Sequence, residues 1–199
     1  MSRIDDPREL LRRALDQASA VLARLQPEHM PLSTPCSEFD ARRLAGHTLF
    51  AAERIAKIGG RQDLSAGDPV VTGLADGEWA PAFDNAAQDA LSAWGGRDAL
   101  DGEIALPFGT FTAPTVVGIY TLEHVVHAWD LAVVVGASSS LDPELADAVL
   151  PLALEMVPPG GRGGDMPFAA VVEVPADAPV YDRLAGYLGR DPGFSPAAR

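Results

Sequence analysis

Apolar residues recur along much of the chain at the three- and four-residue spacing of a helix face. Four segments carry this spacing, and a proline or glycine stands close to both ends of each. Because this period places apolar side chains on one side of a helix, each segment is predicted to form an amphipathic helix. The predicted helices run from Pro7 to Leu25, from Ser37 or Asp40 to about Ile58, from Glu78 to Trp94, and from Pro114 up to Gly136.

The remaining segments predict shorter elements. Residues 102–112 alternate around Pro107 and Gly109, which indicates a short hairpin or an extended crossover before the fourth helix. A glycine-rich stretch lacks the Gly-Lys-Ser/Thr ending of a phosphate loop, so we interpret it as a connection. After Gly136 the order is a helix over 142–157, this connection over 158–164, a short strand over 168–174 and a last helix over 179–188.

These elements define the fold class that we expect. The protein should be mainly all-α, with its long helices forming a four-helix bundle over residues 1–140. Residues 141–199 should form a small α/β extension, mostly helical, that packs on the bundle. Since the whole chain has the length of one domain, this extension is not expected to be an independent domain.

The fourth predicted helix carries ionisable side chains within its apolar face. At about 100° per residue, Glu123, His127 and Asp130 fall on one line of the helix. A carboxylate and an imidazole in a core need a partner, and a metal ion is one such partner. The Glu-x-x-x-His spacing also directs two ligands to one point. The alternative is a buried Glu–His pair that bonds to itself or to Tyr120.

The second predicted helix supplies a further histidine. His47 falls on the face that also carries Leu44 and Ile55, so it should point to the core. Taken alone it is an ordinary core histidine, but beside Glu123 and His127 it is the natural third ligand. Three protein ligands leave a fourth position for water or substrate, which is typical of catalytic rather than structural metal sites.

Composition and charge narrow the function classes. The chain has 199 residues and a net charge of −13, which argues against nucleic acid and anionic membranes as partners. No signal peptide is visible and no stretch of about 18 apolar residues occurs, so we expect a cytoplasmic protein. The single cysteine, Cys36, excludes an internal disulfide and a cysteine-rich zinc site. We interpret it as a structural thiol rather than a reactive one.

Several motifs resemble the DinB-like metal-binding proteins, and within them the group similar to mycothiol-dependent maleylpyruvate isomerase. The resemblance covers most of the chain. The His-Ala-Trp-Asp motif with its upstream glutamate is its most specific part. The matching pieces are Thr34-Pro-Cys-Ser-Glu-Phe-Asp40, Leu44-Ala-Gly-His47, Glu123-His-Val-Val-His-Ala-Trp-Asp-Leu-Ala132, Gly136, Val174-Pro-Ala-Asp-Ala-Pro-Val-Tyr-Asp-Arg183 and Leu188-Gly-Arg-Asp-Pro192.

The resemblance implies a DinB-like four-helix bundle that holds a divalent metal, usually zinc and sometimes nickel, through His47, Glu123 and His127. Enzymes of this family bind a low-molecular-weight thiol at the open metal position. The implied partners are therefore a small thiol of the mycothiol type and a small electrophilic substrate. The maleylpyruvate isomerases have a second, C-terminal domain that supplies part of the active site, and the chain after Gly136 is too short for it. The resemblance does not carry the isomerase reaction itself.

Two further residues lie beside these ligands. Asp130 is expected to orient an imidazole or to bond a helix N-terminus, and its place on the helical wheel would also let it reach the metal. His124 is about 100° from Glu123 and thus at the edge of the face. We expect a rim residue there, with a ligand or a proton carrier as the alternative. No catalytic residue is assigned.

The sequence is compatible with three functions. The first is a thiol-dependent transferase or isomerase-like enzyme that activates a small thiol at the metal. The second is a non-catalytic metal-binding protein that acts as a stress-related or regulatory binding module. The third is a metal-dependent hydrolase that uses the same open position. The sequence also leaves open whether the protein is a homodimer.

Overall fold

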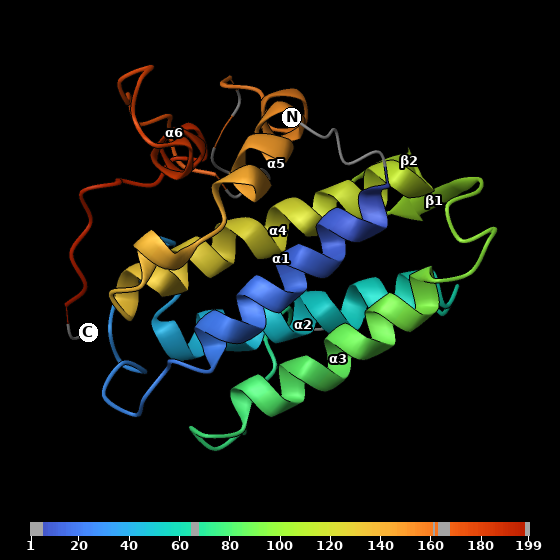
Figure 1. Ribbon diagram of the computed structural model, residues 1–199, viewed down its shortest axis with the longest axis horizontal. Coiled ribbons are helices and arrows are strands. Elements are labelled where there is room, and N and C mark those ends of the chain that lie inside the picture. The colour runs from blue at the N-terminus through green and yellow to red at the C-terminus, as the bar shows by residue number, and fades with distance from the viewer. Residues whose placement is uncertain (1–5, 65–67, 161, 163–167, 198–199) are drawn as a thin grey trace.

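The computed structural model describes residues 6–64, 68–160, 162 and 168–197 of the chain. Within these residues the protein is mainly helical, with one two-stranded sheet (Figure 1), which confirms the mainly all-α class. The elements are, in chain order, α1 (Pro7–Leu22), α2 (Ala41–Gly59), α3 (Trp79–Trp94), β1 (Glu103–Leu106), β2 (Gly109–Thr112), α4 (Ala113–Val134), the 3₁₀ helix η1 (Ser138–Ser140), α5 (Pro143–Met156) and α6 (Val180–Tyr187).

Side-chain caps determine where the long helices begin. The Asp6 carboxylate accepts a hydrogen bond from the Arg8 backbone N–H in the first turn of α1. Of the two candidate caps for α2, Asp40 takes this role and accepts from the Arg43 N–H. Such a cap stabilises a helix by about 1 kcal/mol, because it satisfies a backbone donor that the helix cannot.

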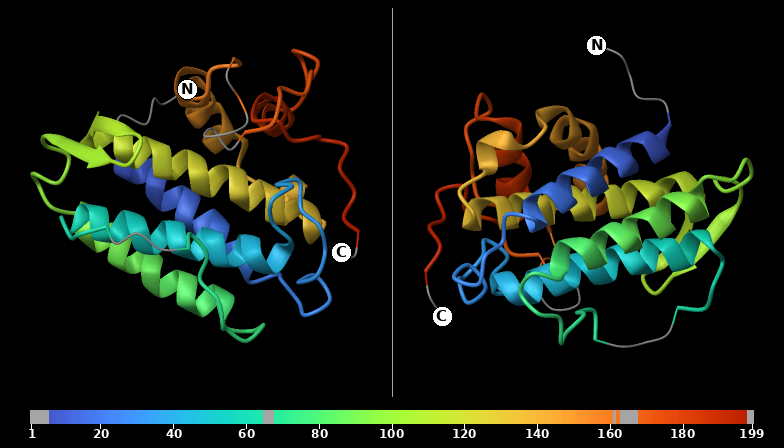
Figure 2. Two further views of the ribbon diagram at one scale, coloured as in Figure 1. Left: turned by 180° about the vertical axis from the view of Figure 1, so that it is seen from behind. Right: turned by 60° about the horizontal axis from the view of Figure 1, so that its bottom comes forward.

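Helices α1 to α4 contact each other in a closed cycle. α1 packs against α3 and α4, and α2 packs against the same two helices. Figures 1 and 2 show α1 beside α4 in one layer and α2 beside α3 in the other. The side chains between the layers form one hydrophobic core, which includes Leu15, Ile55, Phe83 and Trp94.

α4 is buried on nearly all sides. α5 and α6 contact it in addition to α1 and α2, and its buried positions occur all round its circumference. A helix that is apolar all round is typical of the centre of a protein. His124, His127 and Asp130 of α4 are therefore buried, whereas Glu123 is partly exposed. None of the described helices combines the length and hydropathy needed to span a bilayer.

The segment before α4 is a hairpin, which decides between the two alternatives for this region. β1 and β2 pair antiparallel, from Glu103 opposite Thr112 to Leu106 opposite Gly109. Ile104 and Leu106 are buried against the core. The Thr112 side chain then caps α4, so the hairpin leads directly into the helix that carries most of the candidate site.

Helices α5 and α6 are tied to the rest of the chain. α5 contacts α4 and α1, and α6 contacts α5 and α4. The Tyr181 hydroxyl on α6 donates to the Asp142 carbonyl before α5 and accepts from the Gln17 side chain on α1. Packing and hydrogen bonds thus hold both helices against α1 and α4.

The strand predicted over residues 168–174 is wrong. These residues contain no strand, and the Val172 N–H donates instead to the Gly186 carbonyl of α6. A strand needs a neighbouring strand to complete its ladder of hydrogen bonds, and a helix cannot supply one. The described part of the C-terminal region is therefore helical and irregular rather than α/β. Of the connection predicted over 158–164, residues 161, 163 and 164 lie outside the described residues.

Candidate metal centre

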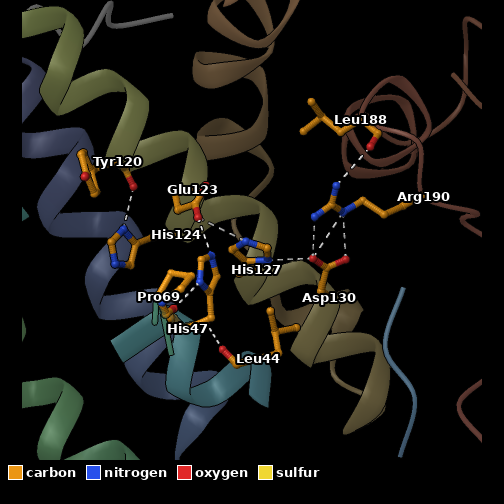
Figure 3. Close-up of polar contacts among 11 residues, drawn as sticks. Leu44, His47, Pro69, Tyr120, Glu123, His124, His127, Asp130, Leu188 and Arg190 are labelled. Carbon is orange, nitrogen blue, oxygen red and sulfur yellow. Dashed lines mark hydrogen bonds and ion pairs between the residues drawn. The ribbon is translucent and has the colours of Figure 1, made fainter. Parts of the chain in front are cut away.

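The segment around Pro69 contacts the His47 side chain of α2 and fixes its orientation. Val71 crosses α2 so closely that a Cβ atom on Gly46 would lie 2.2 Å from the Val71 carbonyl oxygen. Glycine permits this approach because it has no Cβ, and the Val71 N–H donates to the Gly46 carbonyl at 3.1 Å. The same contact places the Pro69 carbonyl oxygen 2.8 Å from His47 Nδ1 (Figure 3).

α4 brings Glu123 and His127 to the same place as His47. The two residues lie one turn apart on α4, and their side chains meet that of His47 between the two helices (Figure 3). Glu123 Oε1 lies 2.8 Å from His47 Nε2 and 3.4 Å from His127 Nε2. The imidazole rings are nearly perpendicular, at 86°, with centroids 5.0 Å apart. The three expected ligands therefore converge, with one donor atom from each within 4.8 Å of the others.

In both imidazoles, Nδ1, the nitrogen that points away from Glu123, already has a hydrogen-bond partner. A backbone carbonyl and an ionised carboxylate can only accept hydrogen bonds. His47 Nδ1 therefore donates to the Pro69 carbonyl at 2.8 Å, and His127 Nδ1 donates to Asp130 Oδ2 at 3.0 Å. Both Nε2 atoms face the Glu123 carboxylate, which is itself an acceptor. This arrangement needs positive charge between the three atoms, and either protons on Nε2 or a divalent metal ion supplies it.

The distances and the donor types fit a metal ion. Zinc bonds imidazole nitrogen and carboxylate oxygen at about 2.1 Å, so tetrahedral ligand atoms lie about 3.4 Å apart. The distance of 3.4 Å between His127 Nε2 and Glu123 Oε1 agrees with this spacing. The distance of 2.8 Å between Glu123 Oε1 and His47 Nε2 is about 0.6 Å shorter, so a bound zinc ion would need these two atoms to separate by that amount. Imidazole and carboxylate donors suit zinc and nickel.

Charge couples the side chains of the site. Burial raises the pKa of Glu123, but the neighbouring imidazoles outweigh it and hold this pKa well below its usual range. Burial lowers the pKa of His127, but Glu123 and Asp130 outweigh it and raise this pKa to about 9. A metal ion bound here would therefore compete with a proton for His127 at neutral pH. The Glu123 side chain is 35% exposed, so solvent reaches the site on that side.

Asp130 is paired with Arg190, which no sequence pattern assigns to the site. Arg190 donates from Nε to both carboxylate oxygens, at 3.1 and 3.3 Å, and from Nη2 to Oδ2 at 3.1 Å. Burial raises the pKa of Asp130, but Arg190 and His127 outweigh it and lower this pKa, so the carboxylate is ionised. Gly189, at φ 82°, turns the chain after α6 and so lets Arg190 reach α4. Asp130 thus bonds to His127 Nδ1, which is the position expected of a group that orients an imidazole.

His124 does not lie at the rim of the site, contrary to expectation. It is fully buried, and its ring centroid lies 5.8 Å from that of Phe83 on α3. Nδ1 donates to the Tyr120 carbonyl at 2.6 Å, and Nε2 has no partner among the described residues. Burial lowers the pKa of His124 to about 4, so the ring is neutral. The expected rim position requires the side of α4 that carries His124 to be exposed to solvent. Neighbouring helices cover this side as well.

Cys36 belongs to a second group of potential ligands, together with His127 and Asp130. Burial raises the pKa of the Cys36 thiol to about 12, so it stays protonated at neutral pH, whereas a metal binds the thiolate. The Asp130 oxygens are also taken by Arg190. The group formed by α2 and α4 is therefore the stronger candidate.

These observations define the class of protein: a mainly helical chain with a His/Glu/His group that could hold a metal ion. No family model matches the chain, and no solved structure matches it significantly. It is similar to the uncharacterized proteins Rv0738 and MT0763 of Mycobacterium tuberculosis, from strains H37Rv and CDC 1551 / Oshkosh. Each is 35% identical over 187 residues, which cover 93% of this chain and 98% of the relative. The chain belongs to the family that contains these mycobacterial proteins.

Proposed function

We propose that this protein binds a divalent metal ion through His47, Glu123 and His127 and uses the open metal position to activate a small thiol. The observation that carries the proposal is the convergence of one oxygen and two Nε2 atoms between α2 and α4. The closed cycle of α1 to α4 supports a DinB-like four-helix bundle. Metal sites in bundles are built from side chains on facing helices, and α2 and α4 are such a pair.

The donor set determines the chemistry proposed for the site. Two neutral imidazoles and one carboxylate leave zinc or nickel with a net charge of about +1 and an open position. A divalent ion held in this way would favour a thiolate over a thiol near neutral pH. A thiolate is the nucleophile of S-transfer and of thiol-assisted isomerisation. We therefore propose a small thiol of the mycothiol type and a small electrophile as partners.

In this proposal, residues around the site hold the ligand side chains in the orientation that a metal ion needs. Pro69 and Asp130 hold the two imidazoles with Nε2 toward Glu123. Because the Glu123 side chain is partly exposed, a small molecule can approach from that side. Only a slender group such as a thiol side chain reaches the ligand atoms, since His127 is 6% exposed and the surrounding helices cover it.

Metal content tests the first half of the proposal. Untagged protein, prepared without added metal or chelator, is analysed by mass spectrometry as wild type, His47→Ala and His29→Ala. His29 is the matched control, because its ring bonds to the Gln26 N–H in a turn away from the site. We expect about one metal ion per chain in the wild type and the control, and none in His47→Ala. A metal-free wild type, even after reconstitution, would contradict metal binding.

Thiol binding tests the second half. Cobalt-substituted protein is titrated with mycothiol and with N-acetylcysteine, and N-acetylserine serves as the control without sulfur. Binding of the thiols at the metal should produce thiolate-to-cobalt charge-transfer absorption, and the hydroxyl analogue should not. If the protein holds metal but its spectrum does not change with thiols, metal binding stands and the proposed thiol-dependent activity is contradicted.

A further inference from the structure

The C-terminal segment meets both parts of the chain that lead to the candidate ligands. After α6, residues 188–197 run toward the loop that precedes α2 (Figures 1 and 2). In that loop the Ser33 N–H donates to the Ala197 carbonyl at 2.8 Å, and Ser33 Oγ accepts from the Ala197 N–H at 3.0 Å. At its other end the segment places Arg190 on Asp130 of α4 (Figure 3).

Arg190 is buried together with the carboxylate that balances its charge. It is 7% exposed, and Asp130 is fully buried. The planar guanidinium contacts both carboxylate oxygens, so it fixes the orientation of the carboxylate as well as its position. The Oδ2 atom held in this way also accepts the hydrogen bond from His127 Nδ1.

This series of contacts determines which nitrogen of His127 faces the site. When Nδ1 carries the proton that bonds to Asp130, the lone pair that a metal needs lies on Nε2. Nε2 is the atom turned toward Glu123. Without the guanidinium, the Asp130 carboxylate would be free to turn about its side-chain bonds, and the imidazole would lose its fixed partner.

We propose that Arg190 is a positioning residue of the metal centre, which acts through Asp130 to hold His127 as an Nε2 ligand. The C-terminal segment is thereby a functional part of the site. The inference rests on the metal binding proposed above. Hydrogen-bond partners behind a metal-bound histidine typically change metal affinity by about 10- to 100-fold.

The alternative is that the Arg190–Asp130 pair stabilises the fold and nothing more. Arg162 provides a matched control for this role. It is also an arginine of the C-terminal region, and it donates to the Val157 and Tyr187 carbonyls and lies 4.8 Å from the centroid of the Tyr187 ring. These contacts join the end of α5 to α6, so their loss should weaken the fold without disturbing the ligands.

The test is a competition titration of zinc against a chelator on full-length wild type, Arg190→Met, Arg190→Lys and Arg162→Met. Arg190→Met should bind zinc about 10- to 100-fold more weakly. Arg190→Lys should recover part of the affinity, since the ammonium group restores the charge without the planar fork. Arg162→Met should keep the wild-type affinity even where its melting temperature falls.

Nitrogen-15 spectra of the histidines in zinc-loaded protein provide a second measurement. Wild-type His127 should show a protonated Nδ1 and a zinc-bound Nε2, and Arg190→Met should lose this fixed pattern. Equal affinity and equal His127 signals in wild type and Arg190→Met would overturn the inference, whatever the change in stability. If Arg190→Met does not fold, Arg190→Lys decides by the same comparison. A wild type that binds no zinc would overturn the proposed function as well, whereas zinc binding independent of Arg190 would overturn this inference alone.

Discussion

The contact at Gly46 predicts that one added methyl group disturbs both the fold and the candidate site. In Gly46→Ala the new Cβ would lie 2.2 Å from the Val71 carbonyl oxygen and 2.9 Å from a Val70 side-chain carbon. Normal contacts between carbon and oxygen are about 3.3 Å or longer, so the segment at Val71 must recede by about 1 Å. This shift weakens the backbone hydrogen bond from Val71 to Gly46 and the hydrogen bond from His47 to the Pro69 carbonyl.

The magnitude follows from these contacts. Overpacking costs about 1–3 kcal/mol, and each of two weakened hydrogen bonds costs about 0.5–1.5 kcal/mol. Alanine recovers about 1 kcal/mol over glycine inside a helix. The net loss is therefore about 1–5 kcal/mol, which for a chain of this size lowers the melting temperature by about 2–20 °C. Because His47 also loses its fixed Nδ1 partner, zinc affinity should fall by about 10-fold or more.

Thermal unfolding of the metal-free protein, followed by circular dichroism, measures the first effect, and zinc competition measures the second. Gly118→Ala is the matched control, because Gly118 also lies within a long helix. Its new Cβ would meet the end of the flexible Leu152 side chain at 3.0 Å, which can move aside. The control should be as stable as the wild type or more stable. The reasoning is refuted if Gly46→Ala unfolds at the wild-type temperature and binds zinc with wild-type affinity.

Three further predictions concern Cys36, Asp130 and His124. Because burial raises the pKa of Cys36 to about 12, iodoacetamide at about pH 8 should alkylate the native chain far more slowly than the urea-unfolded chain, as mass spectrometry can measure. Asp130→Asn leaves the Arg190 charge unpaired and should lower the free energy of unfolding in urea by about 3–5 kcal/mol. The pKa of Asp130 is lower in the folded chain than its value of about 3.9 in the unfolded chain, so this stabilisation is present above that value and is lost as pH falls through the folded pKa. The difference in free energy of unfolding between wild type and Asp130→Asn should therefore shrink in acid. His124→Phe should keep wild-type zinc affinity. It should change the free energy of unfolding by about 1 kcal/mol or less, since it removes one hydrogen bond together with an unpaired nitrogen. Reduced zinc affinity would instead place His124 at the metal.

The candidate site is predictable from the sequence only where its geometry is local. Glu123 and His127 are four residues apart, and helix geometry alone places such a pair on one face. The apolar face of α2 predicts that His47 points to the core, but its distance of 2.8 Å from Glu123 depends on how α2 and α4 pack. Arg190 is 60 positions from Asp130, and no local period relates them. The only available signal is the motif Leu188-Gly-Arg-Asp-Pro192, which carries part of the family resemblance and gives no role to its arginine.

By itself, the sequence determines the approximate positions of the helices, because caps, prolines and apolar periodicity act within a few residues. The predicted first helix runs to Leu25, but α1 ends at Leu22. Asp40 and Pro114, for example, lie at helix starts in both the sequence pattern and the structure. Only the tertiary structure decides that His124 is buried, that residues 168–174 form no strand, and that Arg190 reaches Asp130. Each of these depends on which other element lies alongside, since burial and ion pairing are set by neighbours in space and a strand exists only beside another strand.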